Sequence, residues 1–218
     1  MEKIEKISQT GNTGVIRINA EKGDVFTVAE GSFLSMTDTF DVVLKKHRDL
    51  KKTLEKAISG HKVFLEEYTA IEDGTLILTD TKLGDVLVLN LDSEKEYILE
   101  QKEFMASYGQ IEYEVEGGRI TNLFAGEGLF RLNVKGSGIL CLSAYGLLLE
   151  QEIKENESLI IDMDHIIIRE KQLGYEIVDV ESKKTILEGE GRAAKVTGPG
   201  KVWYQAKTYS AYMSNPEL

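Results

Sequence analysis

The sequence predicts an all-β protein made of three tandem repeats around a pseudo-threefold axis, with one amphipathic helix inserted near residues 44–58. The first observation is that Phe33, Phe104 and Ile166 align at offsets of 71 and 62 residues. The second is that apolar residues then share columns in the three copies: Phe26 with Tyr97 and Leu159, Val28 with Leu99 and Ile161, and Leu34 with Met105 and Ile167. The third is that most apolar runs have the length of strands.

Short apolar or alternating segments place the strands in order along the chain. The 20 glycines fall mostly in short turns between them, and there are only two prolines. The segments are Val25–Ala29, Leu76–Leu78, Val86–Leu91, Glu96–Leu99, Leu129–Val134, Ile139–Leu142, Leu159–Met163 and Val202–Ala206.

Each repeat is predicted to contain two hairpins. The first turns are charged, as loops that face solvent should be, and lie at Glu21–Asp24, Asp92–Lys95 and Lys154–Glu157. The second turns are rich in glycine, which adopts positive φ at little cost, and lie at Ala70–Gly74, Gly136–Gly138 and Gly198–Gly200.

No linker divides the chain, so residues 1–218 are predicted to form a single domain, with repeats at about 8–80, 81–143 and 144–208. The segment Leu44–Ile58 departs from the strand pattern. Its apolar residues recur at helical spacing, and Gly60 follows at the position of a C-terminal cap. We therefore expect one helix here, inserted in the first repeat.

The predicted helix carries six basic residues against Asp49 and Glu55. They are Lys45, Lys46, Arg48, Lys51, Lys52 and Lys56. One interpretation is a contact surface for anionic lipid, nucleic acid or an acidic partner, which would include peripheral membrane contact. The other is a solvated outer face, which is the usual arrangement on a surface helix.

The composition restricts the class of protein. The net charge of −11 argues against nucleic acid as a partner. Cys141 is the one cysteine, so no intramolecular disulfide forms, and its apolar strand predicts an inert core thiol. No signal peptide, transit peptide or membrane-spanning run is visible, so we expect a soluble, cytoplasmic protein.

No constellation of residues specifies a reaction. Asp162, Asp164 and His165 fall at a strand end, and no further ligand converges on them in the sequence. The glycine pairs lack the third glycine of a dinucleotide fingerprint, and nucleophile, P-loop and zinc-protease motifs do not occur. The sequence predicts no catalytic residue, no cofactor and no metal site.

Several short motifs, in this order and spacing, resemble the altered-inheritance-of-mitochondria family in its prokaryotic form. The resemblance covers nearly the whole chain. The motifs are Gly31–Met36, Leu54–Gly60, Phe64–Ala70, Gly126–Leu129, Gly136–Gly138, Ala144–Gly146 and Gly198–Gln205.

The resemblance implies a fold related to the tryptophan RNA-binding attenuation protein (TRAP), with three TRAP-like β-units of the double-stranded β-helix or sandwich type. It implies no established enzymatic activity. Eukaryotic members of the family work in mitochondria, at the inner membrane. The attenuation protein binds tryptophan between subunits and RNA around a ring, but its binding residues have no counterparts that we can place in this sequence.

The function expected from these observations is that of a non-enzymatic interaction or scaffold protein that self-associates as a homo-oligomer or binds another protein. The alternative is a small-molecule-binding protein, with the ligand between repeats or subunits and lined by residues such as Tyr145, Trp203 and Tyr204. An RNA-binding regulator or an enzyme ranks below both.

Overall fold

The protein is described by a computed structural model, which covers residues 2–7, 13–44, 65–79, 84–99, 104–115, 131–178, 193–208 and 211. In these residues the elements are seventeen strands and one 3-10 turn. The described part is therefore all-β, as predicted. Leu44 ends a strand, and the rest of the predicted helix lies outside the described residues.

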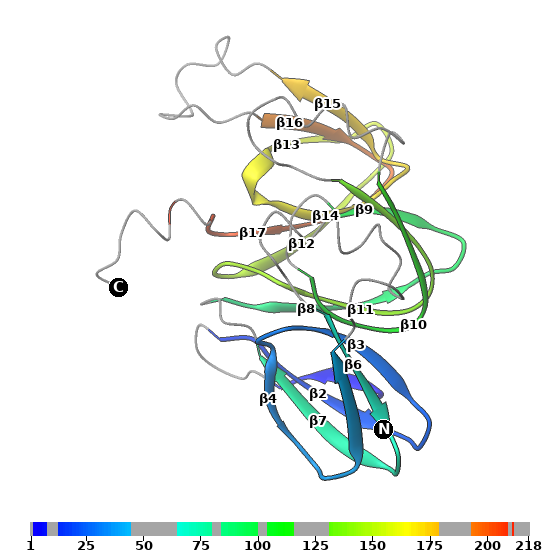
Figure 1. Cartoon of the computed structure of the whole chain (residues 1–218). Coiled ribbons are helices and arrows are strands. Elements are labelled where there is room, and N and C mark those ends of the chain that lie inside the picture. The colour runs from blue at the N-terminus through cyan, green and yellow to red at the C-terminus, as the bar shows by residue number, and fades with distance from the viewer. Residues whose placement is uncertain are drawn as a thin grey trace.

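The strands fall into three consecutive segments, which Figure 1 shows one after another along the molecule. The first segment holds β1 (Ile4–Lys6), β2 (Val15–Ala20), β3 (Val25–Ala29), β4 (Phe33–Met36), β5 (Phe40–Leu44), β6 (Leu65–Ala70) and β7 (Gly74–Thr79). The second holds β8 (Val86–Leu91), β9 (Glu96–Leu99), β10 (Phe104–Val115) and β11 (Leu132–Ser143). The third holds β12 (Leu148–Ile153), β13 (Ser158–Asp162), the 3-10 turn Met163–His165, β14 (Ile166–Glu170), β15 (Gly174–Val178), β16 (Ala193–Thr197) and β17 (Gly200–Gln205).

One scheme of antiparallel pairing recurs in all three segments. In the first, β2 and β4 flank β7, while β3 and β5 flank β6. In the third, β12 and β14 flank β17, while β13 and β15 flank β16. The second segment makes the same pairs with fewer strands, because the long β10 and β11 each supply two of the strand positions. A register shift recurs at Phe33, Phe104 and Ile166.

The predicted turn at Gly136–Gly138 is wrong, because β11 runs through these residues without a break. Gly109 on β10 lies opposite Gly138 on β11, and Gly109 and Gly136 have φ values of +99° and +125°. A Cβ on Gly138 would lie 2.2 Å from the Tyr108 carbonyl oxygen. The glycines here permit a close approach of two long strands, and the backbone bends without leaving the ladder.

Consecutive segments are joined by strand pairing. β10 of the second segment pairs with β3 of the first, and β14 of the third pairs with β9 of the second. A closed arrangement around the predicted threefold axis would also pair β4 with β13. In the described part of the chain β4 pairs only with β7, and β13 only with β16, so the arrangement is open.

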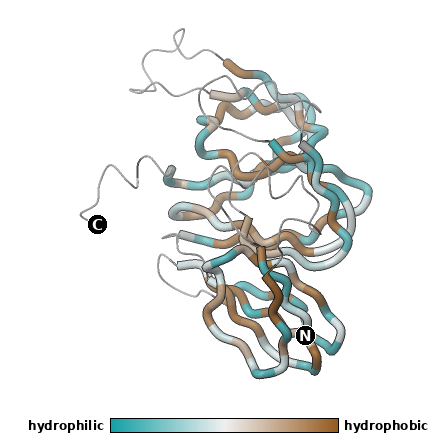
Figure 2. Tube along the Cα trace, viewed as in Figure 1, coloured by the Kyte–Doolittle hydropathy of each residue, from teal (hydrophilic) through white to brown (hydrophobic). Residues whose placement is uncertain are grey.

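The hydrophobic core crosses the joints between segments. One buried cluster contains Ile16 and Phe26 of the first segment together with Met105 and Cys141 of the second. Another contains Leu99 of the second segment and residues from both neighbours, and a third is confined to the third segment. Figure 2 shows hydrophobic stretches along the strands of all three segments. Shared burial therefore stabilises the order of the segments as well as each segment.

Candidate functional site

The six basic residues predicted as an interaction surface, from Lys45 to Lys56, all lie outside the described residues. In the described residues, the candidate site lies instead at the joints between segments and at the two edge strands that have no such joint. The joints between segments are built interfaces, and the two ends of the chain carry one half of such an interface each.

Each joint aligns the same strand positions. At the joint between the first and second segments, Ala106 pairs with Val28 and Tyr108 with Phe26. At the joint between the second and third, Ile168 pairs with Leu99 and Glu170 with Tyr97. The second set lies at the sequence offsets of the repeat, so the two joints are equivalent in register.

The first joint is closed by a polar clasp on Asp24. The Asp24 carboxylate accepts hydrogen bonds from Tyr108 Oη at 2.8 Å and from Lys3 Nζ at 2.6 Å. It also accepts one from the Glu21 backbone N–H at 2.7 Å. Burial acts to raise the pKa of Asp24, but the hydrogen bonds from Lys3, Glu21 and Tyr108 outweigh it and lower the pKa.

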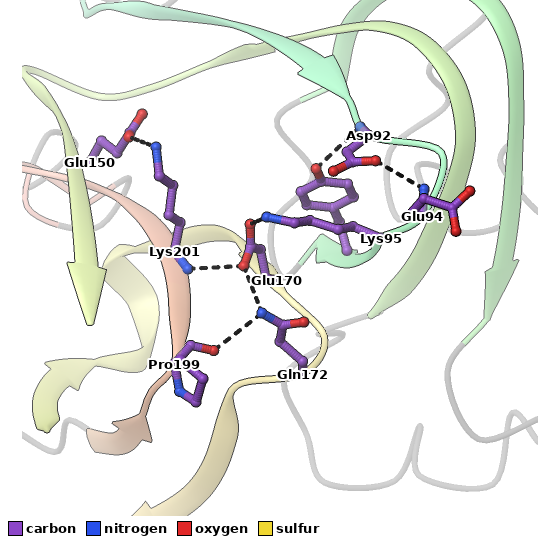
Figure 3. Close-up of polar contacts among 9 residues, drawn as sticks. Asp92, Glu94, Lys95, Glu150, Glu170, Gln172, Pro199 and Lys201 are labelled. Carbon is purple, nitrogen blue, oxygen red and sulfur yellow. Dashed lines mark hydrogen bonds and ion pairs between the residues drawn. The ribbon is translucent and has the colours of Figure 1, made fainter. Parts of the chain in front are cut away.

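The second joint is closed by an equivalent clasp, shown in Figure 3. Lys95 occupies the position of Asp24, and Glu170 that of Tyr108. The Lys95 Nζ lies 2.7 Å from a carboxylate oxygen of Glu170, whose side chain is 3% exposed. The carboxylate also accepts from Gln172 Nε2 at 3.2 Å and from the Lys201 backbone N–H at 3.3 Å. The hydrogen bond to Glu170 raises the pKa of Lys95.

In the first segment, β4 is an edge strand with one neighbour, β7. Phe33, Leu34 and Met36 on this strand are 45%, 53% and 38% exposed. Their counterparts on β10 and β14 are at most 8% exposed. The strand has no charged residue and no proline, which are the usual features that protect an edge from pairing. It is an unprotected edge with an apolar surface.

In the third segment, β13 is an edge strand with one neighbour, β16. Ile160 at its centre is 45% exposed, whereas Ile98 at the same position of β9 is fully buried. An open cleft of about 280 Å³ adjoins this strand, and its lining includes Leu159, Ile160, His165 and Tyr204. The third segment thus presents an apolar strand beside a shallow cavity.

The three aromatic residues predicted to line a ligand site are not brought together in this cleft. Tyr204 lines it. Trp203 is 3% exposed and donates from Nε1 to Glu150 at 2.9 Å, while Tyr145 is 8% exposed. Trp203 packs beside Tyr97 in the core, with ring centroids 6.4 Å apart.

The aspartates and histidine near β13 form a turn, as predicted. Asp162 caps the 3-10 turn by accepting from the Asp164 backbone N–H at 3.0 Å, and His165 Nδ1 lies 2.6 Å from the Gln205 carbonyl oxygen. Cys141 is fully buried, and burial raises its pKa to about 12, which makes the thiol inert. Across the described ranges, no group of three or more His, Cys, Asp or Glu residues could hold a metal ion.

The sequence aligns Phe33 and Leu34 with their counterparts in the other segments but gives no sign that their exposure differs. The missing signal was the position of each segment along the molecule, because a terminal segment has no neighbouring segment on one side. In a chain of stacked repeats, the outer strands of the first and last copies lose the partner that inner copies possess. The exposed apolar residues of β4 and β13 follow from that rule.

Comparison with known proteins is consistent with this architecture. A crystal structure of protein SPYM3_0169 from Streptococcus pyogenes superposes with a TM-score of 0.73 over 97% of each chain, at 23% sequence identity. This likeness shows a shared fold. No curated protein sequence matches the chain. No helix in the described ranges is long and apolar enough to span a membrane.

Residues 6–207 match the protein family described as Mitochondrial biogenesis AIM24. The match takes in all three segments and nearly the whole chain. The chain therefore belongs to the mitochondrial biogenesis AIM24 family.

Proposed function

We propose that this protein is a non-enzymatic interaction or scaffold protein that acts by self-association. The observation that carries the proposal is the β4 edge, defined as Phe33–Met36. Its apolar side chains are exposed, and its outer side has no strand partner in the described structure. Folded proteins usually cover or charge such an edge, so an exposed apolar edge marks a surface for another chain.

We propose further that the three segments are copies of one TRAP-like unit. This proposal is supported by the pairing scheme that the three segments share and by the register shift that recurs at Phe33, Phe104 and Ile166. Copies that stack through strand edges form an array whose ends remain able to pair. Self-association is the direct consequence of such an array, and it requires no catalytic group.

Light scattering coupled to size-exclusion chromatography tests this function. The 24.4 kDa chain is measured over a hundredfold range of concentration. We expect a mass that is a multiple of the chain mass and that falls on dilution. A single monomeric mass at every concentration would contradict self-association.

The open cleft beside β13 supports small-molecule binding as a second candidate function. Its volume of about 280 Å³ is close to the lower limit for ligand sites, and Tyr204 and His165 supply polar groups among apolar neighbours. Because the cleft borders an edge strand, such a ligand would lie between subunits. A thermal-shift screen of metabolites tests it, with Tyr204→Ala as the control variant that should abolish any shift.

A further inference from the structure

We propose that β4 of one copy pairs with β13 of a second copy, in the register that joins the segments within the chain. This inference rests on the proposed self-association and names its partner and its interface. The pairing would be antiparallel, with Ser35 opposite Ile161 of the second copy, Met36 opposite Ile160 and Thr37 opposite Leu159. The two joints already present in the structure define this register.

The two free strands are halves of the same interface. At both internal joints, a strand equivalent to β4 (β10 or β14) pairs with a strand equivalent to β13 (β3 or β9). Transferring the register by the repeat offsets gives the same three residue pairs from either joint. The ends of the chain thus present one β4-type strand and one β13-type strand that are complementary to each other.

The sheet composition supports the same pairing. The first segment contains a separate sheet in the order β1-β2-β7-β4, and the third contains a separate sheet in the order β13-β16-β15. Where segments meet inside the chain, these two kinds of half-sheet are continuous, as in β12-β17-β14-β9-β11-β10. Joining β4 to β13 would complete a sheet of the same kind.

Other edge strands do not fit this role. β5 and β15 each have a single neighbour, and so does their counterpart, the second half of β10. These edges are unpaired in every segment, so their exposure is a constant feature of the unit. β8 and β12 also have a single neighbour, and the second neighbour of their counterpart β2 is β1, which occurs in the first segment alone among the described strands. Within the described ranges, β4 and β13 are distinguished by lacking a partner that both of their counterparts possess.

Burial follows the same rule. Leu34 is 53% exposed, whereas its counterparts Met105 and Ile167 are 1% and 0% exposed. Ile160 is 45% exposed, whereas Ile98 is fully buried. At both positions the residue at the end of the chain is more exposed than its counterparts at the internal joints, of which Thr27 is half-buried and the others are buried.

The two positions of the polar clasp have counterparts at the proposed joint. Asp24 and Lys95 are the counterparts of Glu157, while Tyr108 and Glu170 are the counterparts of Thr37. Glu157 and Thr37 are both exposed in the single chain. The proposed pairing would bring Thr37 beside Glu157 of the second copy, where a charge at position 37 would be felt directly.

The resulting contact is head-to-tail, because each copy has one β4 edge and one β13 edge, defined as Ser158–Asp162. A contact of this kind produces a closed ring when the rotation between copies closes, and a filament when it does not. It differs from a twofold dimer, in which β4 would meet β4.

A charge-reversal experiment tests the register. Thr37→Glu would place two carboxylates together and should weaken association about tenfold or more, measured as the midpoint of the mass against concentration. Adding Glu157→Lys to the same chain should restore association, because it recreates the Lys95–Glu170 pair. Glu155→Lys, the same change of charge two residues away on the exposed turn, is the matched control and should not restore it.

A disulfide experiment gives an independent test that does not depend on the stability of Thr37→Glu. Met36→Cys protein is mixed with Ile160→Cys protein under mild oxidation, and Cys141 remains buried in both. We expect a cross-linked dimer of the two variants, and little product when Ser158→Cys replaces Ile160→Cys, because its Cβ is displaced along the strand.

The outcomes separate this inference from the proposed function. Cross-linking of Met36→Cys with itself in place of Ile160→Cys would overturn the head-to-tail register in favour of a twofold contact. Oligomers that persist with neither cross-linking nor an effect of Thr37→Glu would overturn the proposed interface but leave self-association standing. A monomer at every concentration would overturn both.

Discussion

The Lys95 ammonium and the buried Glu170 carboxylate lie 2.7 Å apart, at the same joint position that Asp24 and Tyr108 hold one segment earlier. Two different pairs of residue types thus perform one structural task. Each pair connects the turn before a strand equivalent to β13 (β3 or β9) to a strand equivalent to β4 (β10 or β14). The two joints have a polar contact at the same position, although the residue types that form it differ. We infer that the geometry of the joint favours a polar contact there, whichever residues supply it.

We expect Lys95→Met to lower the free energy of unfolding by about 1–3 kcal/mol. The change removes the charged partner of Glu170, and the buried carboxylate then keeps only the bonds from Gln172 and the Lys201 backbone. Because Lys95 is 38% exposed, solvent screens the ion pair itself, and most of the loss comes from the carboxylate. Urea unfolding measures the difference.

Lys171→Met is the matched control for that prediction. Lys171 pairs with Glu96, but both side chains are more than 40% exposed. Exposed ion pairs contribute little, so we expect no measurable change. Equal losses in the two variants would show that the buried clasp has no special weight.

We expect Asp24→Asn to destabilise the protein at neutral pH and to lose this effect in acid. The pKa of Asp24 is lowered in the folded state, so its carboxylate stabilises the fold above the ordinary value of 3.8. This stability is lost as the pH falls from there through the lowered pKa, because the unfolded chain binds the proton first. Urea unfolding at pH 7 and at pH 3 measures the two differences.

Tyr108→Phe should produce part of the same change. It removes one of the hydrogen bonds that hold the pKa of Asp24 down, so the acid limit of stability should move to higher pH. An Asp24→Asn difference that stays constant between pH 7 and pH 3 would contradict the role of ionisation.

We expect alanine substitutions at equivalent positions of the repeat to differ sharply in cost. Met105→Ala removes a side chain that is 1% exposed and should cost about 2–5 kcal/mol. Leu34→Ala, at 53% exposure, should change monomer stability by no more than about 0.5 kcal/mol. Unfolding at low protein concentration gives both values, and similar costs would mean that the β4 edge is covered within the chain.

The basic face, defined as the six basic residues from Lys45 to Lys56, is tested by replacing four of them with Gln. The four are Lys45, Lys46, Lys51 and Lys52. If this face is a contact surface, wild-type protein binds anionic vesicles and the binding weakens steeply with salt, because charges are screened over about 8–10 Å. The variant should then lose binding and keep its fold. Vesicle sedimentation at low and high salt measures this, and equal binding by both proteins would identify a solvated surface.

The sequence by itself predicted the strands because their signal is local. Alternation of apolar residues and charged turns such as Asp92–Lys95 reflect which side of a strand meets water. Within the described residues the structure places a strand in each of those segments and turns at those charged loops, although Met163 lies in the 3-10 turn and β11 begins only at Leu132. The burial of Cys141 followed in the same way from its apolar neighbours.

Tertiary structure decided everything that depends on which strand lies beside which. The glycines at 136 and 138 have the composition of a turn, yet pairing with β10 draws them into one long strand. The exposure of Leu34 could not be read from its column, because its counterparts Met105 and Ile167 are buried. An edge is defined by the absence of a neighbour, which is a property of the arrangement in space and is not encoded in any single residue.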